Sequence, residues 1–145
     1  MAARTGEGRA ALVEAGYELI AELGYSGATT AKICQRAGVS SGTFFHFFPT
    51  KMDLLLGILE ADASHSRLRA DALNARASID PAGALSTWLD TLFAEASDPH
   101  LAGFVAGLSA APAHTPLEEC LSEIAALQHT TLVSIVAAGQ VRGIW

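Results

Sequence analysis

The chain has 145 residues, of which half are hydrophobic, and its formal net charge is −6. This length is sufficient for one good core, or for a small helical head joined to a larger helical body. No continuous apolar run is close in length to the about 20 residues that a membrane-spanning helix needs. No continuous apolar stretch of the kind found in a secretory signal precedes Glu14. We therefore predict a cytoplasmic protein that does not bind a membrane.

Charge is unevenly distributed along the chain. Residues 1–60 carry a net charge of −1, and residues 61–145 carry −5. A nearly neutral first part permits contact with a nucleic acid but is not positive evidence for one. The two cysteines, Cys34 and Cys120, are far apart and match no metal-binding spacing. We predict reduced thiols, no metal site and no cofactor.

The first predicted helix runs from about Glu7 to Leu23, after a loose arm at residues 1–6. Gly24 is placed to end it. Arg4 and Arg9 near its start either reach a phosphate or form a solvated helix end. The apolar residues that recur at helical spacing, and should face the core, are Leu12, Ala15, Leu19, Ile20 and Leu23.

Two short helices with a tight turn are predicted between Thr29 and Lys51. Thr29 and Thr30 can cap the first of them, and Gly38 can end it in a left-handed conformation. The second helix begins at Ser40 or Ser41 and extends to Phe48 at most, because a proline follows. Thr50 is then placed to cap the next helix.

The predicted outer face of the second short helix has an unusual composition. A purely solvated helix would carry Lys and Glu, whereas this face has small hydroxyl groups, a glycine and an imidazole, which permit close approach to another surface. In a helix-turn-helix the start of the second helix enters the DNA major groove. The alternative is a helical hairpin that only packs. The residues on this face are Ser40, Ser41, Gly42, Thr43 and His46.

The stretch GYSGATTAKICQRAGVSSGTFFHFFPTKMDLL resembles the DNA-binding segment of the TetR family of bacterial transcriptional regulators. The resemblance covers about the first 60 residues. It implies an all-α fold with a three-helix helix-turn-helix head and a helical effector-binding and dimerisation body. The matching positions are Gly24, Thr29, Thr30, Ile33, Ala37, Gly38, Val39, Ser40, Gly42, Thr43, Phe48, Lys51 and Leu54.

The resemblance implies roles for individual residues on the DNA side. Ser41, Thr43 and His46 would approach base edges, whereas Thr30, Ser40 and Lys51 would hold phosphates. Two departures lower the expected affinity. Phe45 stands where the family has a tyrosine whose hydroxyl contacts a phosphate, and Ser41 stands where a lysine is common. The full set of expected DNA-binding residues is Thr29, Thr30, Ser40, Ser41, Gly42, Thr43, Phe45, His46 and Lys51.

Helical periodicity continues from Lys51 to about Arg76, and Ser78 to Gly83 forms a break. Three further helices are expected at about Ala82–Ala96, Pro99–Ala111 and Pro116–Gln140. The second is apolar nearly all round and should be buried. By residue type alone, the walls of an effector pocket would be Trp88, Phe93, His100, Phe104, Leu108 and Leu121, although each of them is also a typical core residue.

We therefore predict a DNA-binding head at residues 1–50 and a helical ligand-binding body at residues 51–145 that begins with a connecting helix. The resemblance implies a transcriptional regulator, most often a repressor, that binds a palindromic double-stranded operator as a homodimer and is released by a small apolar or amphipathic effector. Family members usually continue with two more long helices that form the dimer interface. We therefore expect either that this chain is truncated or that it dimerises in a different way.

Two alternatives from other classes remain. The first is a helical ligand-binding or interaction protein that no longer reads DNA, which Phe45, Ser41 and the acidic total favour. The second is an all-helical enzyme, but no carboxylate pair, nucleophile signature or phosphate-binding glycine loop supports a catalytic site.

Overall fold

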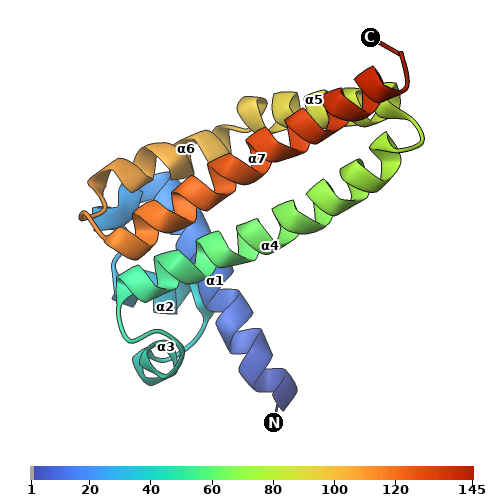
Figure 1. The fold of residues 1–145 in the computed structure, drawn as a ribbon. Coiled ribbons are helices and arrows are strands. Elements are labelled where there is room, and N and C mark those ends of the chain that lie inside the picture. The colour runs from blue at the N-terminus through green and yellow to red at the C-terminus, as the bar shows by residue number, and fades with distance from the viewer. Residues whose placement is uncertain (1) are drawn as a thin grey trace. The chain divides into compact units, whose positions relative to one another are not determined.

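A computed structural model describes residues 2–145, with side chains from Gly6 onward, and the regular secondary structure of this part of the chain is all helical (Figure 1). The predicted all-α class is therefore confirmed. The helices are α1 (Ala2–Gly27), α2 (Thr30–Ala37), α3 (Ser41–Phe47), α4 (Lys51–Ala77), α5 (Pro81–Ser97), α6 (Pro99–Gly107), the 3-10 turn η1 (Leu108–Ala110) and α7 (Thr115–Val141).

The helices form two compact units. The N-terminal unit comprises the chain up to Leu59 together with Asp98–His114, and the C-terminal unit comprises Glu60–Ser97 and Thr115–Trp145. Helix α6 thus belongs by packing with the first three helices. The predicted division at residue 50 concerns function rather than packing, and it stays a prediction.

Helix α1 differs from its prediction mainly at its start. It begins at Ala2, so the residues expected to form a loose arm are helical from there on. The predicted break at Gly24 is confirmed, because this glycine has a non-helical φ of 75°. A short helical segment follows this kink, and α1 includes it as far as Gly27. The predicted inward face is confirmed at Leu12, Ala15, Leu19 and Ile20, which are all buried. Leu23 was wrongly placed there: it lies just before the kink and is 47% exposed.

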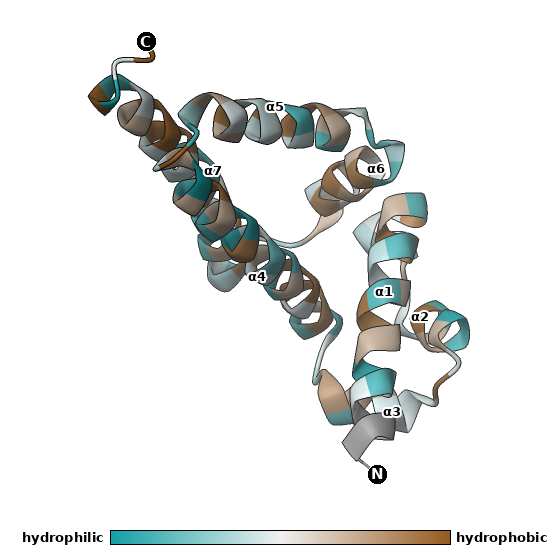
Figure 2. Ribbon diagram, turned by 90° about the vertical axis from the view of Figure 1, so that its right-hand side faces the viewer, coloured by the Kyte–Doolittle hydropathy of each residue, from teal (hydrophilic) through white to brown (hydrophobic). Residues whose placement is uncertain are grey.

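Helix α6 packs on α1 through one face only. Figure 2 shows that α6 is mostly apolar, which agrees with the sequence. Nevertheless, only Phe104 and Gly107 are buried in it, and Val105 is 59% exposed. The prediction that this helix is buried is therefore wrong for most of its residues. The helix also ends at Gly107 rather than near Ala111, because a 3-10 turn follows.

In the C-terminal unit, α5 packs against α7 around a small core of Ala77, Ala84 and Ile135. Asp80 caps α5 by accepting a hydrogen bond from the Gly83 N–H at 2.9 Å. This contact, and the neighbouring Arg76 guanidinium, lower the pKa of Asp80. A hydrogen bond from the Arg142 guanidinium to the Ser78 carbonyl, at 2.8 Å, also fixes the segment between α4 and α5.

Helix α7 bears on the prediction that the chain has no segment apolar and long enough to span a membrane. It is 27 residues long, and its most apolar 18-residue window has a mean hydropathy of 1.3, with 17% of that window buried. By length and composition alone it could cross a membrane. One such helix is weak evidence, because interface and core helices of other proteins meet the same test.

Candidate functional site

Local capping explains why α2 begins and ends where the sequence predicts. Thr29 is the N-cap, and its side chain accepts a hydrogen bond from the Lys32 N–H at 3.3 Å. At the other end, Gly38 has a φ of 70°. The Val39 N–H then donates to the Cys34 carbonyl at 3.1 Å, which satisfies a carbonyl of the last turn. Both predicted ends are confirmed.

Helix α3 is capped by Ser40. Its hydroxyl oxygen accepts a hydrogen bond from the Thr43 N–H at 3.1 Å and lies 3.0 Å from the Thr43 hydroxyl. The helix ends at Phe47, in agreement with the predicted limit, and Phe44 and Phe48 are buried beneath it. The two hydroxyl groups that were expected to contact DNA therefore also fix the start of the helix.

The outward face of α3 agrees with the sequence analysis. Ser41, Gly42 and His46 are exposed, Phe45 is 54% exposed, and Thr43 is half-buried. Within the same unit, α1 passes close to α3 at Gly8. A Cβ atom there would lie 3.5 Å from Phe47 and 3.7 Å from Thr43. The sequence analysis did not anticipate this contact, which has no local signal.

The start of α4 is fixed by two sets of contacts. Thr50 and Asp53 form a capping box, in which the Asp53 N–H donates to the Thr50 hydroxyl at 3.1 Å and the Thr50 N–H donates to Asp53 at 2.9 Å. The Lys51 ammonium donates to the Tyr25 carbonyl at 2.6 Å and lies 4.1 Å from the centre of the Tyr25 ring. Burial lowers the pKa of Lys51.

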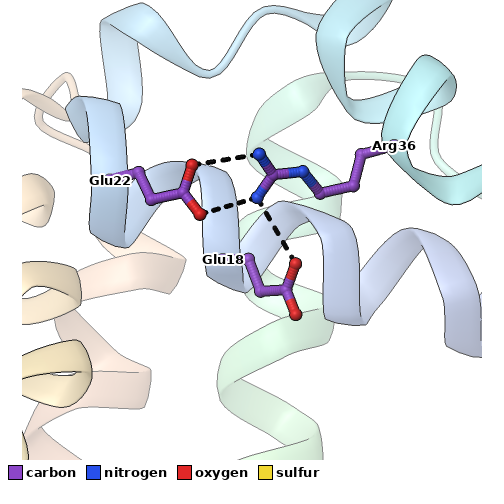
Figure 3. Close-up of polar contacts among 3 residues, drawn as sticks. All are labelled: Glu18, Glu22 and Arg36. Carbon is purple, nitrogen blue, oxygen red and sulfur yellow. Dashed lines mark hydrogen bonds and ion pairs between the residues drawn. The ribbon is translucent and has the colours of Figure 1, made fainter.

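Arg36 joins α2 to α1 (Figure 3). Its two terminal nitrogens bind the carboxylate of Glu22 at 2.7 and 3.0 Å, and one of them also lies 3.4 Å from Glu18. The hydrogen bond from Arg36 holds the pKa of Glu22 below its usual range, and the same bond raises the pKa of Arg36. This cation is therefore neutralised by α1.

The other cations of the N-terminal unit are placed differently. Arg9 lies over the Phe48 ring, 5.2 Å from its centre. The side chain of Arg4 lies outside the described residues. Lys32 is exposed on α2. Among these cations, Arg9, Arg36 and Lys51 thus each have a contact within the protein. The predicted lowering of DNA affinity by Phe45 and Ser41 stays a prediction.

The six residues proposed for the effector pocket are not gathered in one place. His100, Phe104 and Leu108 belong to the N-terminal unit, where Tyr17 contacts the rings of His100 and Phe104 at centroid distances of 5.4 and 4.8 Å. In the C-terminal unit, Phe93 is 68% exposed and Leu121 is 38% exposed. Trp88 alone among the six lines the cavity described next.

A cavity of about 270 Å³ lies within the C-terminal unit, between α4, α5 and α7. The sequence analysis missed it because it selected aromatic and apolar residues, whereas eight of the 14 lining residues are polar or charged. A signal was present: Ser66, Arg69, Ala70, Leu73 and Arg76 recur at the spacing of one helix face. These five residues line the cavity from α4, with Trp88 and Glu95 from α5 and Gln128 and Thr131 from α7.

The thiols and metal-ligating residues offer no further site. Cys34 and Cys120 are both free, and burial raises the pKa of each thiol. Among the residues that the structure describes, no group of three or more His, Cys, Asp and Glu side chains could hold a metal ion.

Comparisons with known proteins agree with this geometry. The family model described as bacterial regulatory proteins, tetR family, matches residues 12–58, which include α2, α3 and the start of α4. Over 49 residues the chain is 37% identical to the fatty acid metabolism regulator protein of Bacillus subtilis (strain 168). That match covers 34% of this chain and spans only a quarter of the relative's length.

Solved structures share the fold over most of the chain. The fatty acid degradation regulator FadR from Bacillus halodurans is 24% identical, with a TM-score of 0.68 over 93% of this chain and 72% of its own. FadR from Bacillus subtilis, solved with stearoyl-CoA, is 24% identical, with a TM-score of 0.70 over 92% and 71%. An ArpA-like gamma-butyrolactone receptor is 21% identical, with a TM-score of 0.61 over 93% and 78%.

The capped helix pair, its outward polar face and the matched segment agree on one assignment. Residues 12–58 therefore form an N-terminal domain of the tetR family of bacterial regulatory proteins.

Proposed function

We propose that the protein is a transcriptional regulator that binds a palindromic operator as a homodimer and releases it when a small molecule occupies the helical body. The observation that carries this proposal is the outward face of α3. Ser41, Gly42 and His46 are exposed at the part of a helix-turn-helix that enters the major groove, in a domain of a DNA-binding family.

Roles for single residues follow from this placement. Ser41 and His46 are exposed and would approach base edges, with the Thr43 hydroxyl beside them. Ser40 and Lys51 would face phosphates. Ser40 has a second acceptor lone pair besides the one used in capping, and the Lys51 ammonium has donors beyond the one bound to Tyr25.

Dimerisation is proposed from the same symmetry argument that applies to other helix-turn-helix proteins. Two heads must be separated by about one helical turn of DNA, or ~34 Å, to read a palindrome. Helix α7 supports a partner surface, because it is apolar while little of its central window is buried, with Val133 51% exposed.

An amphipathic effector is proposed from the relatives, and a repressor mode from the family resemblance. One relative is named as a regulator of fatty acid metabolism, and one solved structure contains stearoyl-CoA. A ligand of this protein would act by binding the DNA-free conformation more tightly, since only differential affinity shifts an equilibrium.

Selection of bound fragments from genomic DNA, with the oligomeric state measured at the same concentration, tests the proposal. We expect enrichment of a palindromic site. A second candidate, a ligand-binding protein that no longer reads DNA, is favoured by the neutralised Arg36 and would give a dimer with no enriched sequence. If the protein is a dimer and enriches no DNA sequence, this second candidate is the correct one.

A variant pair connects the selected site to α3. Ser41→Ala with His46→Ala removes two exposed polar groups without touching the Ser40 cap, so α3 should stay folded. We expect loss of the preference for the selected site over random DNA, measured by competition. Asp71→Ala, an exposed change on α4 in the other unit, is the control. Unchanged specificity in the double variant would contradict base reading by α3.

A further inference from the structure

The cavity of the C-terminal unit has a charge pattern that identifies a class of ligand. Arg69 and Arg76 both line it from α4, and Glu95 is the carboxylate that lines it from α5. The two arginines are seven residues apart, so they lie on the same face of the helix, two turns from each other. Between them lies Leu73, and Trp88 faces the same cavity from α5.

Arg69 and Arg76 are not engaged equally. Arg76 uses both terminal nitrogens: one donates to the Thr87 hydroxyl at 2.9 Å and the other to Asp80 at 3.2 Å. Arg69 uses one nitrogen, which lies 3.0 Å from Glu95 and 3.1 Å from the Ser66 hydroxyl. Its contact with Glu95 thus lacks the two-point geometry that Arg36 makes with Glu22 in the other unit.

A guanidinium has five N–H donors arranged to bind a carboxylate at two points. Arg69 lines the cavity and contacts Glu95 through one nitrogen only. The carboxylate of a ligand in the cavity could therefore form one more hydrogen bond with Arg69 than Glu95 does. Replacement of Glu95 by a ligand carboxylate would also break the ion pair that joins α4 to α5 at this point.

We propose that this cavity binds a small carboxylate with a short apolar body, and that the carboxylate displaces Glu95 from Arg69. The proposal rests on the ligand-responsive function proposed above and specifies its effector. The apolar body would lie against Leu73 and Trp88. A volume of about 270 Å³ is just below the roughly 300–1,000 Å³ typical of ligand sites, so the ligand is small.

Calorimetry on the full chain with hexanoate, and with hexanamide as a neutral molecule of the same size, tests the proposal. We expect hexanoate to bind about 10- to 100-fold more tightly, the range expected for a charge-assisted hydrogen bond. Arg69→Met should remove this preference while keeping the apolar stem. Glu95→Gln should strengthen hexanoate binding, because it removes the competing carboxylate.

Arg67→Met is the matched control. Arg67 lies on the same helix and pairs with Glu123 at 3.7 Å, but it does not line the cavity, so hexanoate affinity should not change. Equal binding of hexanamide, no binding of either probe, or a preference that survives Arg69→Met would overturn the proposal. Loss of the preference in Arg76→Met alone would also overturn the assignment to Arg69.

The failure of this proposal can be told apart from failure of the proposed function. Operator binding is measured on the same variants by competition in the absence of hexanoate. Sequence-specific DNA binding without carboxylate binding would reject the proposed ligand class but would still support the proposed function as a regulator. Carboxylate binding without any enriched DNA site would support the ligand class and reject the proposed function as a DNA-binding regulator.

Discussion

At the scale of single residues, the N-terminal unit uses several of its cations for its own structure. Arg36 is held by two carboxylates of α1, Arg9 lies on an aromatic ring, and Lys51 is bound to a backbone carbonyl. A cation already paired within the protein offers less to a phosphate, because binding must first replace its partner. The contacts of each cation, and not only the net charge of the unit, should therefore influence the proposed DNA binding.

Arg36→Met tests whether the contact with α1 stabilises the helix pair. Glu22 has a pKa below its ordinary value in the folded protein, so the unfolded chain takes up the proton first as the pH falls. The stabilisation is then fully present above the ordinary pKa of a glutamate and is lost as the pH falls through the lower, folded value. We expect the variant to be less stable than the natural sequence at pH 7, and the difference to shrink at pH 3, as measured by urea unfolding. A difference that does not depend on pH would mean that Arg36 acts through packing or the helix dipole instead.

Lys51→Met separates a structural role from a DNA role. Methionine keeps an apolar stem against Tyr25 but loses the ammonium. If Lys51 also holds a phosphate, its loss should reduce the slope of log affinity against log salt by about 0.9 for each contact removed. The measurement is operator affinity over a salt series. Lower stability with an unchanged slope would show that this lysine only anchors the start of α4.

At the scale of elements, the contact between α6 and α1 depends on glycine. A Cβ atom added at Gly103 would lie 2.7 Å from the Ala21 carbonyl oxygen, and one at Gly107 would lie 2.5 Å from that of Ile20. Both partners are backbone atoms, which cannot turn aside as a side chain can. The two glycines, four residues apart, therefore let the two helix backbones approach closely.

Gly107→Ala should destabilise the N-terminal unit. Alanine favours the helix by up to about 1 kcal/mol, whereas forcing an extra carbon into a packed contact costs about 1–3 kcal/mol and here meets backbone. We expect a lower free energy of unfolding by denaturant titration. Gly6→Ala, in α1 with no atom within 4 Å of the added carbon, is the control and should not lower stability. An unchanged or higher stability in Gly107→Ala would show that α6 can shift without cost.

At the scale of the whole molecule, the compact unit that contains the helix-turn-helix is not continuous in sequence. It takes α6 and η1 from residues after the C-terminal unit has begun, and Phe104 of α6 is only 4% exposed. Removal of α6 would uncover the part of α1 that Phe104 and the two glycines contact. The first 59 residues alone should therefore form a weaker head than the complete unit.

A fragment of residues 1–59 tests this dependence. We expect its α1 amide groups to exchange with solvent faster than those of the full chain under the same conditions, because α6 no longer covers them. Hydrogen exchange of both proteins is the measurement. Equal protection in the fragment would show that the three N-terminal helices and the start of α4 are sufficient by themselves.

The sequence by itself determined the features that depend on near neighbours. Thr29, Gly38, Ser40 and Thr50 cap or end helices through hydrogen bonds that span at most a few residues, so their positions in the chain were enough to predict them. The exposed face of α3 followed from helical spacing in the same way. These local features lie within residues 12–58, the segment that the family model matches.

Only the tertiary structure decided which distant residues meet. The contacts of Arg36 with Glu22, of Lys51 with Tyr25 and of Gly107 with α1 join different helices, and nothing in local spacing specifies them. The proposed effector pocket shows the same limit. Residue type selected apolar side chains that lie in two different units, whereas the cavity is formed where faces of three helices meet and carries polar groups. A cavity depends on how helices are arranged in space, which the residues of one helix do not determine.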